Sequence, residues 1–165
     1  MDLTSQACTP VALRANSLTH SASPRAYLIG LSTAQRQPLL GDYDQGLFRL
    51  SDCGQIVADE WVRSASNRKG IELDVWTMTP DRLQSIVFLP GGGSSERELA
   101  DHLLGHKPWL LSSFIASFKA AAAKHVNLRR NQLGQPVWQR NYDELLIADP
   151  AKLNHLRDQL RGAVS

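Results

Sequence analysis

Lysine and arginine side chains gather in the second half of the chain, and they are the first candidates for chemistry in this sequence. From Lys107 to the end there are nine basic and four acidic residues, whereas the first 106 residues hold nine basic and twelve acidic residues. The cations on or near one expected helix are Lys119, Lys124, Arg129 and Arg130. Such side chains neutralise phosphates, so this excess predicts a polyanionic partner. A solvated helix face explains the same charges, and both interpretations stay open.

Tyr142 and two histidines are the other side chains that could act as a nucleophile or as metal ligands. Tyr142 stands four residues after Trp138, where it would serve either as a nucleophile or as an aromatic packing partner. His102 and His106 have the spacing of a two-histidine metal site on one face of a helix. Gly105 makes a continuous helix there unfavourable, so we expect both histidines to be ordinary surface residues.

The composition indicates a single globular domain without membrane segments. The chain has 165 residues, of which 42% are hydrophobic and 21% are charged, and this suits one domain with its own core. The sequence lacks the run of eighteen apolar residues that a membrane helix needs. It also lacks the basic start followed by an apolar run that marks a secretory signal. Cys8 and Cys53 lack metal-site spacing. We therefore expect a cytoplasmic protein, with a loose arm over residues 1–24 and one domain over residues 25–165.

Alternating apolar residues and turn signals predict the strands that position these groups. The first strand alternates from Tyr27 to Leu31, and Pro80 marks the turn of a hairpin. Leu73 and Val75 are expected to share one face of their strand because they are two residues apart. The expected strands cover residues 25–33, 47–49, 71–78, 83–89 and 137–148.

Capping residues predict three long helices among these strands. Ser51 is expected to cap the first, Pro108 to lie in the first turn of the longest, and Asp149 followed by Pro150 to open the last. A shorter helix is expected over residues 96–104. The order of strands and helices predicts an α+β sandwich, in which helices are packed on one face of an antiparallel sheet.

Several segments resemble one family, in the order in which that family has them. These are Ala26-Tyr27-Leu28-Ile29 with Arg36, the stretch from Gly46 to Trp61, Leu73-Asp74-Val75-Trp76-Thr77-Met78 followed by Pro80, Phe114 with Ser117-Phe118-Lys119, and the stretch from Gly134 to Tyr142. Together they resemble the REP-associated tyrosine transposases and related single-domain HUH transposases of insertion sequences, over roughly residues 25–165. The resemblance implies a ferredoxin-like fold that binds single-stranded or hairpin DNA.

The resemblance also implies a cleavage chemistry, from which this chain departs at every position. In the family, two histidines two residues apart on a strand and a polar residue of the last helix hold Mg²⁺ or Mn²⁺, and a tyrosine attacks the phosphate. Aligned on Pro80, the two histidines are replaced by Arg82 and Gln84. Aligned without a gap on the segment from Trp138 to Tyr142, the nucleophile position holds Gln159 and the third ligand position holds Ala163. We therefore expect neither a metal cofactor nor strand cleavage.

The residues that replace the metal ligands would retain a role in DNA binding if they bind phosphate directly. Arg82 is a permanent cation whose planar fork fits a phosphate, and Gln84 lies beside it on the same strand face. Alternatively, Arg82 faces solvent or pairs with Asp81 or another carboxylate. Arg36 and Arg140 are further candidates on the same grounds. The predicted nucleic-acid-binding residues are Arg36, Arg82, Gln84, Lys119, Lys124, Arg129, Arg130 and Arg140.

Three functions are compatible with these observations. The first is a transposase-like DNA-binding protein that lacks strand cleavage. The second is an active tyrosine transposase or DNA nickase that uses Tyr142 as a substitute nucleophile, with its metal site rebuilt elsewhere. The third is a protein-interaction module on the same fold. The expected partner is single-stranded or hairpin DNA rather than a membrane, and a homodimer is compatible with the sequence.

Overall fold

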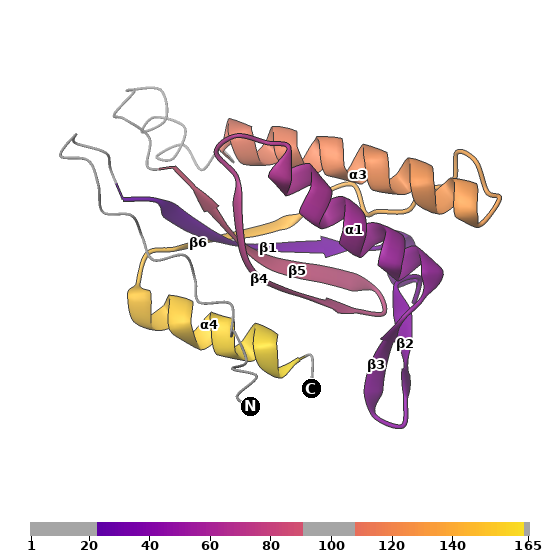
Figure 1. Cartoon of the computed structure of the whole chain (residues 1–165), viewed down its shortest axis with the longest axis horizontal. Coiled ribbons are helices and arrows are strands. Elements are labelled where there is room, and N and C mark those ends of the chain that lie inside the picture. The colour runs from indigo at the N-terminus through magenta and orange to yellow at the C-terminus, as the bar shows by residue number, and fades with distance from the viewer. Residues whose placement is uncertain (1–22, 91–107, 164–165) are drawn as a thin grey trace, which may run out of the picture.

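Six strands and three α-helices make up the part of the chain that the structure describes. The computed structural model describes residues 23–90 and 108–163, so the expected arm, the expected helix over residues 96–104 and the pair His102 and His106 lie outside it. In chain order the elements are β1 (Arg25–Ser32), the short 3-10 helix η1 (Ala34–Arg36), β2 (Gly41–Asp44), β3 (Leu47–Leu50), α1 (Asp52–Ser66), β4 (Glu72–Thr79), β5 (Arg82–Leu89), α3 (Trp109–Arg129), β6 (Asp143–Ile147) and α4 (Pro150–Gly162) (Figure 1). None of these helices is both long enough and apolar enough to cross a membrane.

The main sheet has four strands in the order β4-β5-β1-β6, and each neighbouring pair is antiparallel. The strand β1 is central, because Gly30 pairs with Gln84 of β5 on one side and with Asp143 of β6 on the other. Together with α1 and α3, these strands follow a βαββαβ path, which is that of a ferredoxin-like sandwich. The predicted α+β class with an antiparallel sheet is confirmed.

The helices α1 and α3 cover one face of the sheet and enclose the larger of two hydrophobic cores. Trp61 of α1 packs against Phe114 and Phe118 of α3, with ring centroids 5.2 and 4.8 Å apart. Alternate residues of β1, from Tyr27 to Leu31, are buried against these helices. The two-residue period of the strand and the helical spacing of the aromatic residues therefore meet in one core.

The helix α4 lies on the opposite face of the sheet (Figure 1). Its Leu160 joins Ala26, Ile86 and Ile147 in the smaller core, and two further leucines of α4 pack at its margin. The predicted packing of helices on a single face therefore describes α1 and α3, and α4 is an addition to it. The reason is physical: the second face of the sheet carries apolar side chains of its own, and the leucine side of α4 buries them.

A β-bulge in β4 changes which of its side chains face which core. β4 pairs with β5 at Leu73 and again from Trp76 onward, and the register shifts between these two residues. A shift of one residue turns a side chain to the other face of a sheet. Leu73 consequently packs against the larger core, whereas Val75 packs against the smaller one. The prediction that Leu73 and Val75 share a face is wrong for this reason.

Capping signals act as the sequence predicts. The Ser51 hydroxyl accepts a hydrogen bond from the Gly54 N–H at 2.9 Å, at the start of α1. The Asp149 carboxylate accepts one from the Ala151 N–H at 2.9 Å, with Pro150 in the first turn of α4. These contacts satisfy N–H groups that the start of a helix leaves unpaired, and so they fix where α1 and α4 begin.

Two expected strands differ from the observed ones. Of the strand predicted over residues 137–148, only β6 forms, and the residues before it make a loop with one bridge between Thr33 and Trp138. Conversely, residues 41–50 form a complete β2–β3 hairpin that projects from the body of the protein (Figure 1), where only a short strand is predicted.

Candidate functional site

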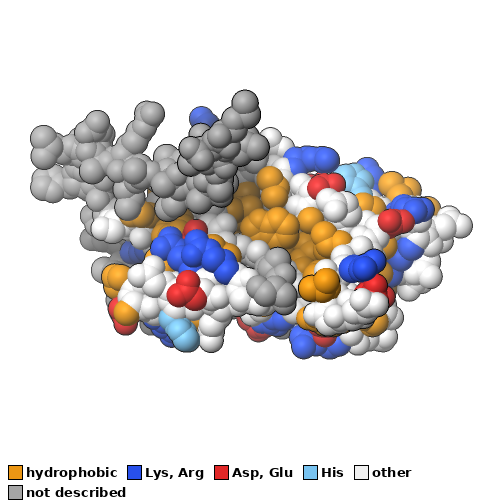
Figure 2. Space-filling model, turned by 60° about the horizontal axis from the view of Figure 1, so that its bottom comes forward, with side chains coloured by type: hydrophobic (Ala, Val, Ile, Leu, Met, Phe, Trp, Pro, Cys, Tyr) orange, Lys and Arg blue, Asp and Glu red, His pale blue; other side chains and the backbone are white. Residues whose placement is uncertain are grey.

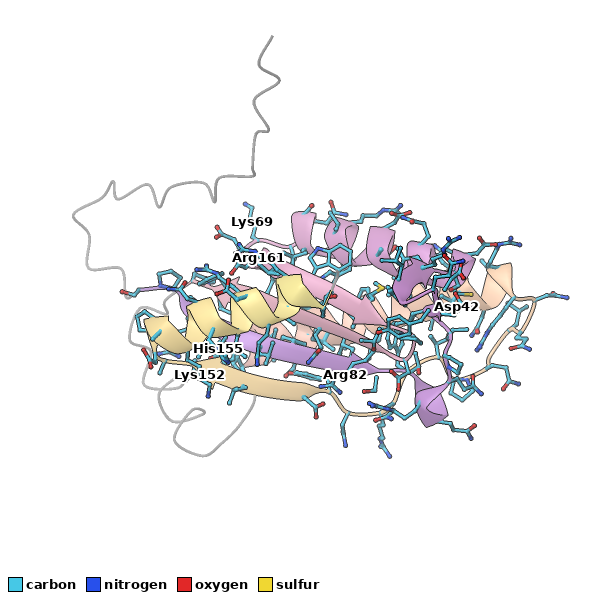
Figure 3. All side chains as sticks on the ribbon, turned by 90° about the horizontal axis from the view of Figure 1, so that it is seen from below. Asp42, Lys69, Arg82, Lys152, His155 and Arg161 are labelled. Carbon is cyan, nitrogen blue, oxygen red and sulfur yellow. The ribbon has the colours of Figure 1, made fainter. Side chains whose placement is uncertain are left out.

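Arg82 and Gln84 lie on the same face of β5, as their spacing predicts. Leu83 between them is 1% exposed and belongs to the larger core. Ile86, the next residue on the Arg82 face, is buried in the smaller core beneath α4. Figure 3 shows Arg82 beyond the end of α4, on a part of the sheet where the helix ribbon does not lie. Arg82 and Gln84, which are predicted to correspond to the metal ligands of the resembling family, therefore point to the α4 side of the sheet.

The Arg82 side chain crosses the central strand and connects three strands. Its Nη1 donates to Ser32 Oγ of β1 at 2.9 Å, and its Nη2 lies 2.7 Å from Asp143 Oδ2 of β6. Between these contacts the guanidinium lies over Gly30, where the absence of a side chain leaves room for it. Where the sequence leaves open whether Arg82 faces solvent or pairs with a carboxylate, the structure has it paired with Asp143.

Arg36 reaches the same serine. Its Nη1 donates to Ser32 Oγ at 2.9 Å, and its Nε lies 2.9 Å from Asp81 Oδ2. The backbone of η1 is unusual, since Gln35 and Arg36 have φ values of 53° and 55°, a region that residues other than glycine rarely adopt. Such strain persists only where the surroundings hold it. We refer to the group Ser32, Arg36, Asp81, Arg82 and Asp143 as the Ser32 cluster.

The sequence points to part of this cluster and misses the rest. Arg36 and Arg82 are predicted from it, and Asp81 is named as a partner for Arg82, although it pairs with Arg36 instead. Ser32 and Asp143 are not predicted. Ser32 carries one weak signal, because it shares the strand face of Gly30 in an alternating strand. Asp143 is 61 residues from Arg82, and nothing local in the sequence relates the two.

The donors on this face do not fit the metal ion that the resemblance implies. Arg82 has no lone pair to give a metal, and one amide oxygen from Gln84 is a poor site by itself. Among the residues that the structure describes, no group of three or more His, Cys, Asp and Glu side chains is arranged to hold a metal. The expectation that no metal cofactor is used stays a prediction, and its basis is this donor chemistry.

Gln159 and Ala163 are the residues that the gapless alignment predicts at the family positions of the nucleophile and the third ligand. Both side chains are exposed, Gln159 in the last turn of α4 and Ala163 at its C-terminal cap. The buried residue of this turn is Leu160, which packs under Ile86. Neither an amide nor a methyl group can attack a phosphate.

Tyr142 lies on the other side of the sheet, against the larger core. Its hydroxyl lies 3.1 Å from Ser112 Oγ and donates to Glu144 Oε2 at 3.2 Å. Burial raises the pKa of Tyr142 to about 12, and the nearby Glu144 carboxylate adds to this increase. The hydrogen bond with Ser112 lowers the pKa but does not outweigh these effects. A phenol with this pKa is protonated near neutral pH and is a poor nucleophile. The geometry therefore favours a packing role for Tyr142 over a catalytic one.

Lys119, predicted to contact phosphate, holds a loop of the protein. Its Nζ donates to the backbone carbonyls of Gln139 and Asn141, at 2.8 and 3.0 Å. This loop leads directly into β6, whose first residue is Asp143. Lys119 therefore helps to place the carboxylate that pairs with Arg82.

The other predicted cations lie apart from the Ser32 cluster. Arg129 pairs with Asp52 at the start of α1, and Arg130 Nε donates to Asn127 Oδ1 at 2.8 Å. Lys124 and Arg140 are exposed. On the face drawn in Figure 2, Lys and Arg side chains alternate with Asp and Glu and do not form one continuous basic patch. The structure thus brings together Arg36 and Arg82 and leaves the α3 cations separate.

Comparisons with known proteins identify the fold. No family model matches the chain, and no curated protein matches its sequence. Among solved structures, a REP-associated tyrosine transposase bound to a REP hairpin is similar with a TM-score of 0.52 and 14% sequence identity, over 88% of this chain and 69% of that one. A candidate transposase from Deinococcus radiodurans R1 is similar with a TM-score of 0.50 and 14% identity, over 89% of this chain and 96% of that one. The predicted resemblance to transposases is confirmed at the level of the fold.

Proposed function

We propose that the protein binds single-stranded or hairpin DNA through the sheet face that carries Arg82, and that it does not cleave this DNA. The shared fold with a transposase bound to a hairpin supports the first half. The observation that carries the proposal is Arg82 itself. A permanent cation lies across the sheet, and the alignment on Pro80 assigns its position to the first metal-binding histidine of the resembling family.

Arg82 is suited to hold a phosphate and not to activate one. A guanidinium has five N–H donors in a plane, and the bonds to Ser32 and Asp143 use two of them. Its fork matches the oxygens of a phosphodiester. Binding by such contacts releases counterions from DNA, and affinity then falls steeply as salt rises.

The absence of cleavage is inferred from the side chains at the family positions. Gln84 and Gln159 supply neither the histidine nor the tyrosine of the resembling chemistry, and Tyr142 faces the larger core with a pKa of about 12. Without a nucleophile beside the bound phosphate, no covalent protein–DNA link forms.

The β2–β3 hairpin favours a second candidate function, a protein-interaction module. Tyr43 and Leu47 on this projecting hairpin are 57% and 58% exposed, although both are large apolar residues. Exposed apolar side chains grouped on a projecting element are typical of protein interaction sites. This candidate requires no nucleic acid, and so binding measurements separate it from the first.

A gel-shift titration with a labelled single-stranded hairpin tests the proposal. The full chain is incubated with the hairpin at several salt concentrations, with Mg²⁺ or Mn²⁺ present, and the products are then denatured to detect nicks and covalent adducts. We expect a salt-dependent shift and an intact oligonucleotide. Arg82→Ala should bind more weakly and lower the slope of log affinity against log salt by about 1.

The matched control is Arg49→Ala. Arg49 also pairs with an exposed carboxylate, Asp44 at 2.9 Å, but lies on the β2–β3 hairpin. It should bind as the wild type does. Equal affinity of Arg82→Ala and wild type at low salt would overturn the assignment of Arg82. A nick or an adduct would overturn the absence of cleavage, and no shift at low salt would favour the protein-interaction candidate.

A further inference from the structure

We infer that the Ser32 cluster is a site for a terminal phosphate of a nucleic-acid strand, in which Arg36 and Arg82 bind the phosphate and Asp143 is the group that it displaces. This inference rests on the proposed function and specifies the ligand of the same site. It concerns the protein's own cations and requires no metal.

Two guanidinium groups converge on one oxygen atom. Arg36 Nη1 and Arg82 Nη1 each donate to Ser32 Oγ at 2.9 Å. One is carried by η1 and the other by β5, so the two cations approach the serine from separate elements. A phosphate beside this serine would accept from the remaining N–H donors of both guanidinium groups, in charge-assisted bonds that are stronger than those to a neutral hydroxyl.

The phosphate at a strand end offers the two guanidinium groups more charge and more acceptor oxygens than an internal phosphate does. Each arginine has a carboxylate partner of its own, Asp81 for Arg36 and Asp143 for Arg82. When the ligand replaces Asp143, Asp81 still neutralises one cation, so the preference for a strand end rests on the stronger attraction between its higher charge and the two guanidinium groups. An internal phosphodiester carries one negative charge, whereas a terminal phosphate carries between about 1.5 and 2 near pH 7 and has three acceptor oxygens.

Asp143 is the partner that can leave. Its side chain is 72% exposed, so a carboxylate released from Arg82 is hydrated at once. Asp81 is held more firmly, because its side chain is 27% exposed and also accepts a hydrogen bond from Thr79 Oγ1 at 3.2 Å. We therefore expect Asp81 to keep Arg36 in place while the phosphate replaces Asp143 on Arg82.

Gly30 leaves room for the Arg82 guanidinium to lie against the backbone of β1. The Arg82 guanidinium lies against this residue, and a Cβ atom there would be 2.1 Å from Nη2. The cation consequently lies close over β1, with its Nη2 directed to Asp143. This leaves Arg82 reachable from the side of Asp143. The phosphate of a strand end would approach the arginine from there, past the start of β6.

The test compares one hairpin sequence with a 5′-phosphate, with a 3′-phosphate and with hydroxyl groups at both ends. We expect one phosphorylated end to raise the affinity of the wild type by about tenfold, as two added charge-assisted bonds would. Arg36→Gln and Arg82→Gln should lose this increment, and Arg82→Lys should recover only part of it. Arg49→Gln should keep it in full.

Asp143→Asn should raise the affinity for the phosphorylated hairpin, whereas the arginine variants lower it. A variant that had lost its structure would not bind more tightly. If the carboxylate competes with the phosphate, this variant should bind the phosphorylated hairpin several-fold more tightly than the wild type. Thermal melting of each variant, followed by circular dichroism, verifies that it is folded. A weaker or unchanged affinity of folded Asp143→Asn contradicts the displacement.

Competition by inorganic phosphate distinguishes a strand end from a free ion. Millimolar phosphate should reduce only the increment from the phosphorylated end if the end is the natural ligand. Equal binding of all three hairpins overturns the inference and leaves the proposed function standing. If no hairpin binds, the proposed function fails. Calorimetry with inorganic phosphate on the wild type and on Arg82→Gln then tests whether the Ser32 cluster binds phosphate at all. Phosphate binding that is absent, or that is equal in both proteins, overturns the inference.

Discussion

The guanidinium group of Arg82 lies directly over Gly30. A Cβ atom at position 30 would be 2.1 Å from Arg82 Nη2 and 2.7 Å from its Cζ, far inside normal contact distance. Gly30 is also paired on both sides, with Gln84 and with Asp143. A glycine in a central strand usually weakens it, and here the close approach of a side chain accounts for its presence.

Gly30→Ala should displace Arg82 and leave the sheet intact. The clashing atoms are the end of a flexible side chain and not backbone, so the arginine moves away from Ser32 and Asp143. The free energy of unfolding should fall by about 1 kcal/mol or less, because a partly exposed ion pair contributes little. Urea unfolding of Gly30→Ala, Arg82→Ala and the double variant measures the coupling. Fully additive effects would show that position 30 does not act through Arg82.

Gly54→Ala should destabilise the protein, although alanine is the better helix former. In α1 a Cβ at position 54 would lie 1.9 Å from the Leu40 carbonyl oxygen, and a backbone atom cannot yield as a side chain does. We expect the free energy of unfolding to fall by about 2 kcal/mol, after allowing for the gain of about 1 kcal/mol that alanine brings to a helix. Gly162→Ala is the control, since nothing lies within 4 Å of its Cβ position. Thermal melts should show a lower midpoint for Gly54→Ala alone.

Tyr142 should make stability depend on pH above its ordinary titration range. The folded pKa of about 12 lies above the unfolded value near 10 because burial disfavours the phenolate. The unfolded state therefore loses its proton first. The stabilisation is complete below pH 10 and is lost as the pH rises through 12. Unfolding midpoints of wild type and Tyr142→Phe should converge over this window, and a constant difference would contradict the shifted pKa.

Arg157→Ala should loosen α4 more than the rest of the protein. Arg157 pairs with Asp74 of β4 across a little-exposed contact, and its Cζ lies 5.8 Å from the Phe88 ring centroid. Its loss leaves a carboxylate without its cation and should cost about 1 to 3 kcal/mol. Hydrogen exchange should then show faster exchange of α4 amides than of β1 amides. Arg161→Ala, which loses only an exposed contact to Asp158 at 3.9 Å, should change little.

Local signals in the sequence predict much of this fold. Ser51 and Asp149 cap the helices that they are expected to cap, because a cap is decided by residues within one turn of it. The shared face of Arg82 and Gln84 follows from strand geometry alone. The bulge before Trp76 is different, since it depends on how β4 meets β5 and leaves no mark in the sequence of β4.

The candidate site depends on contacts between distant parts of the chain. Asp143 and Arg82 are 61 residues apart and meet only because β6 and β5 flank the same strand. Lys119 has the composition signal of a phosphate contact, yet it donates to two backbone carbonyls, and any residue type can supply these. Charge and residue type therefore predict which side chains matter, whereas only topology reveals their partners.

The central place of β1 has a consequence for how this protein acquires its structure during synthesis. Ala26, near the start of β1, takes Ile147 of β6 as its neighbour, so this inner strand of the sheet waits for an element that is translated much later. Until then one edge of β1 lacks its ladder of hydrogen bonds, and its apolar side chains remain open to misfolding contacts. Pairing over such a sequence separation slows folding. We therefore expect a nascent chain that ends before Asp143 to be recognised by chaperones, and to be released from them once β6 has left the ribosome.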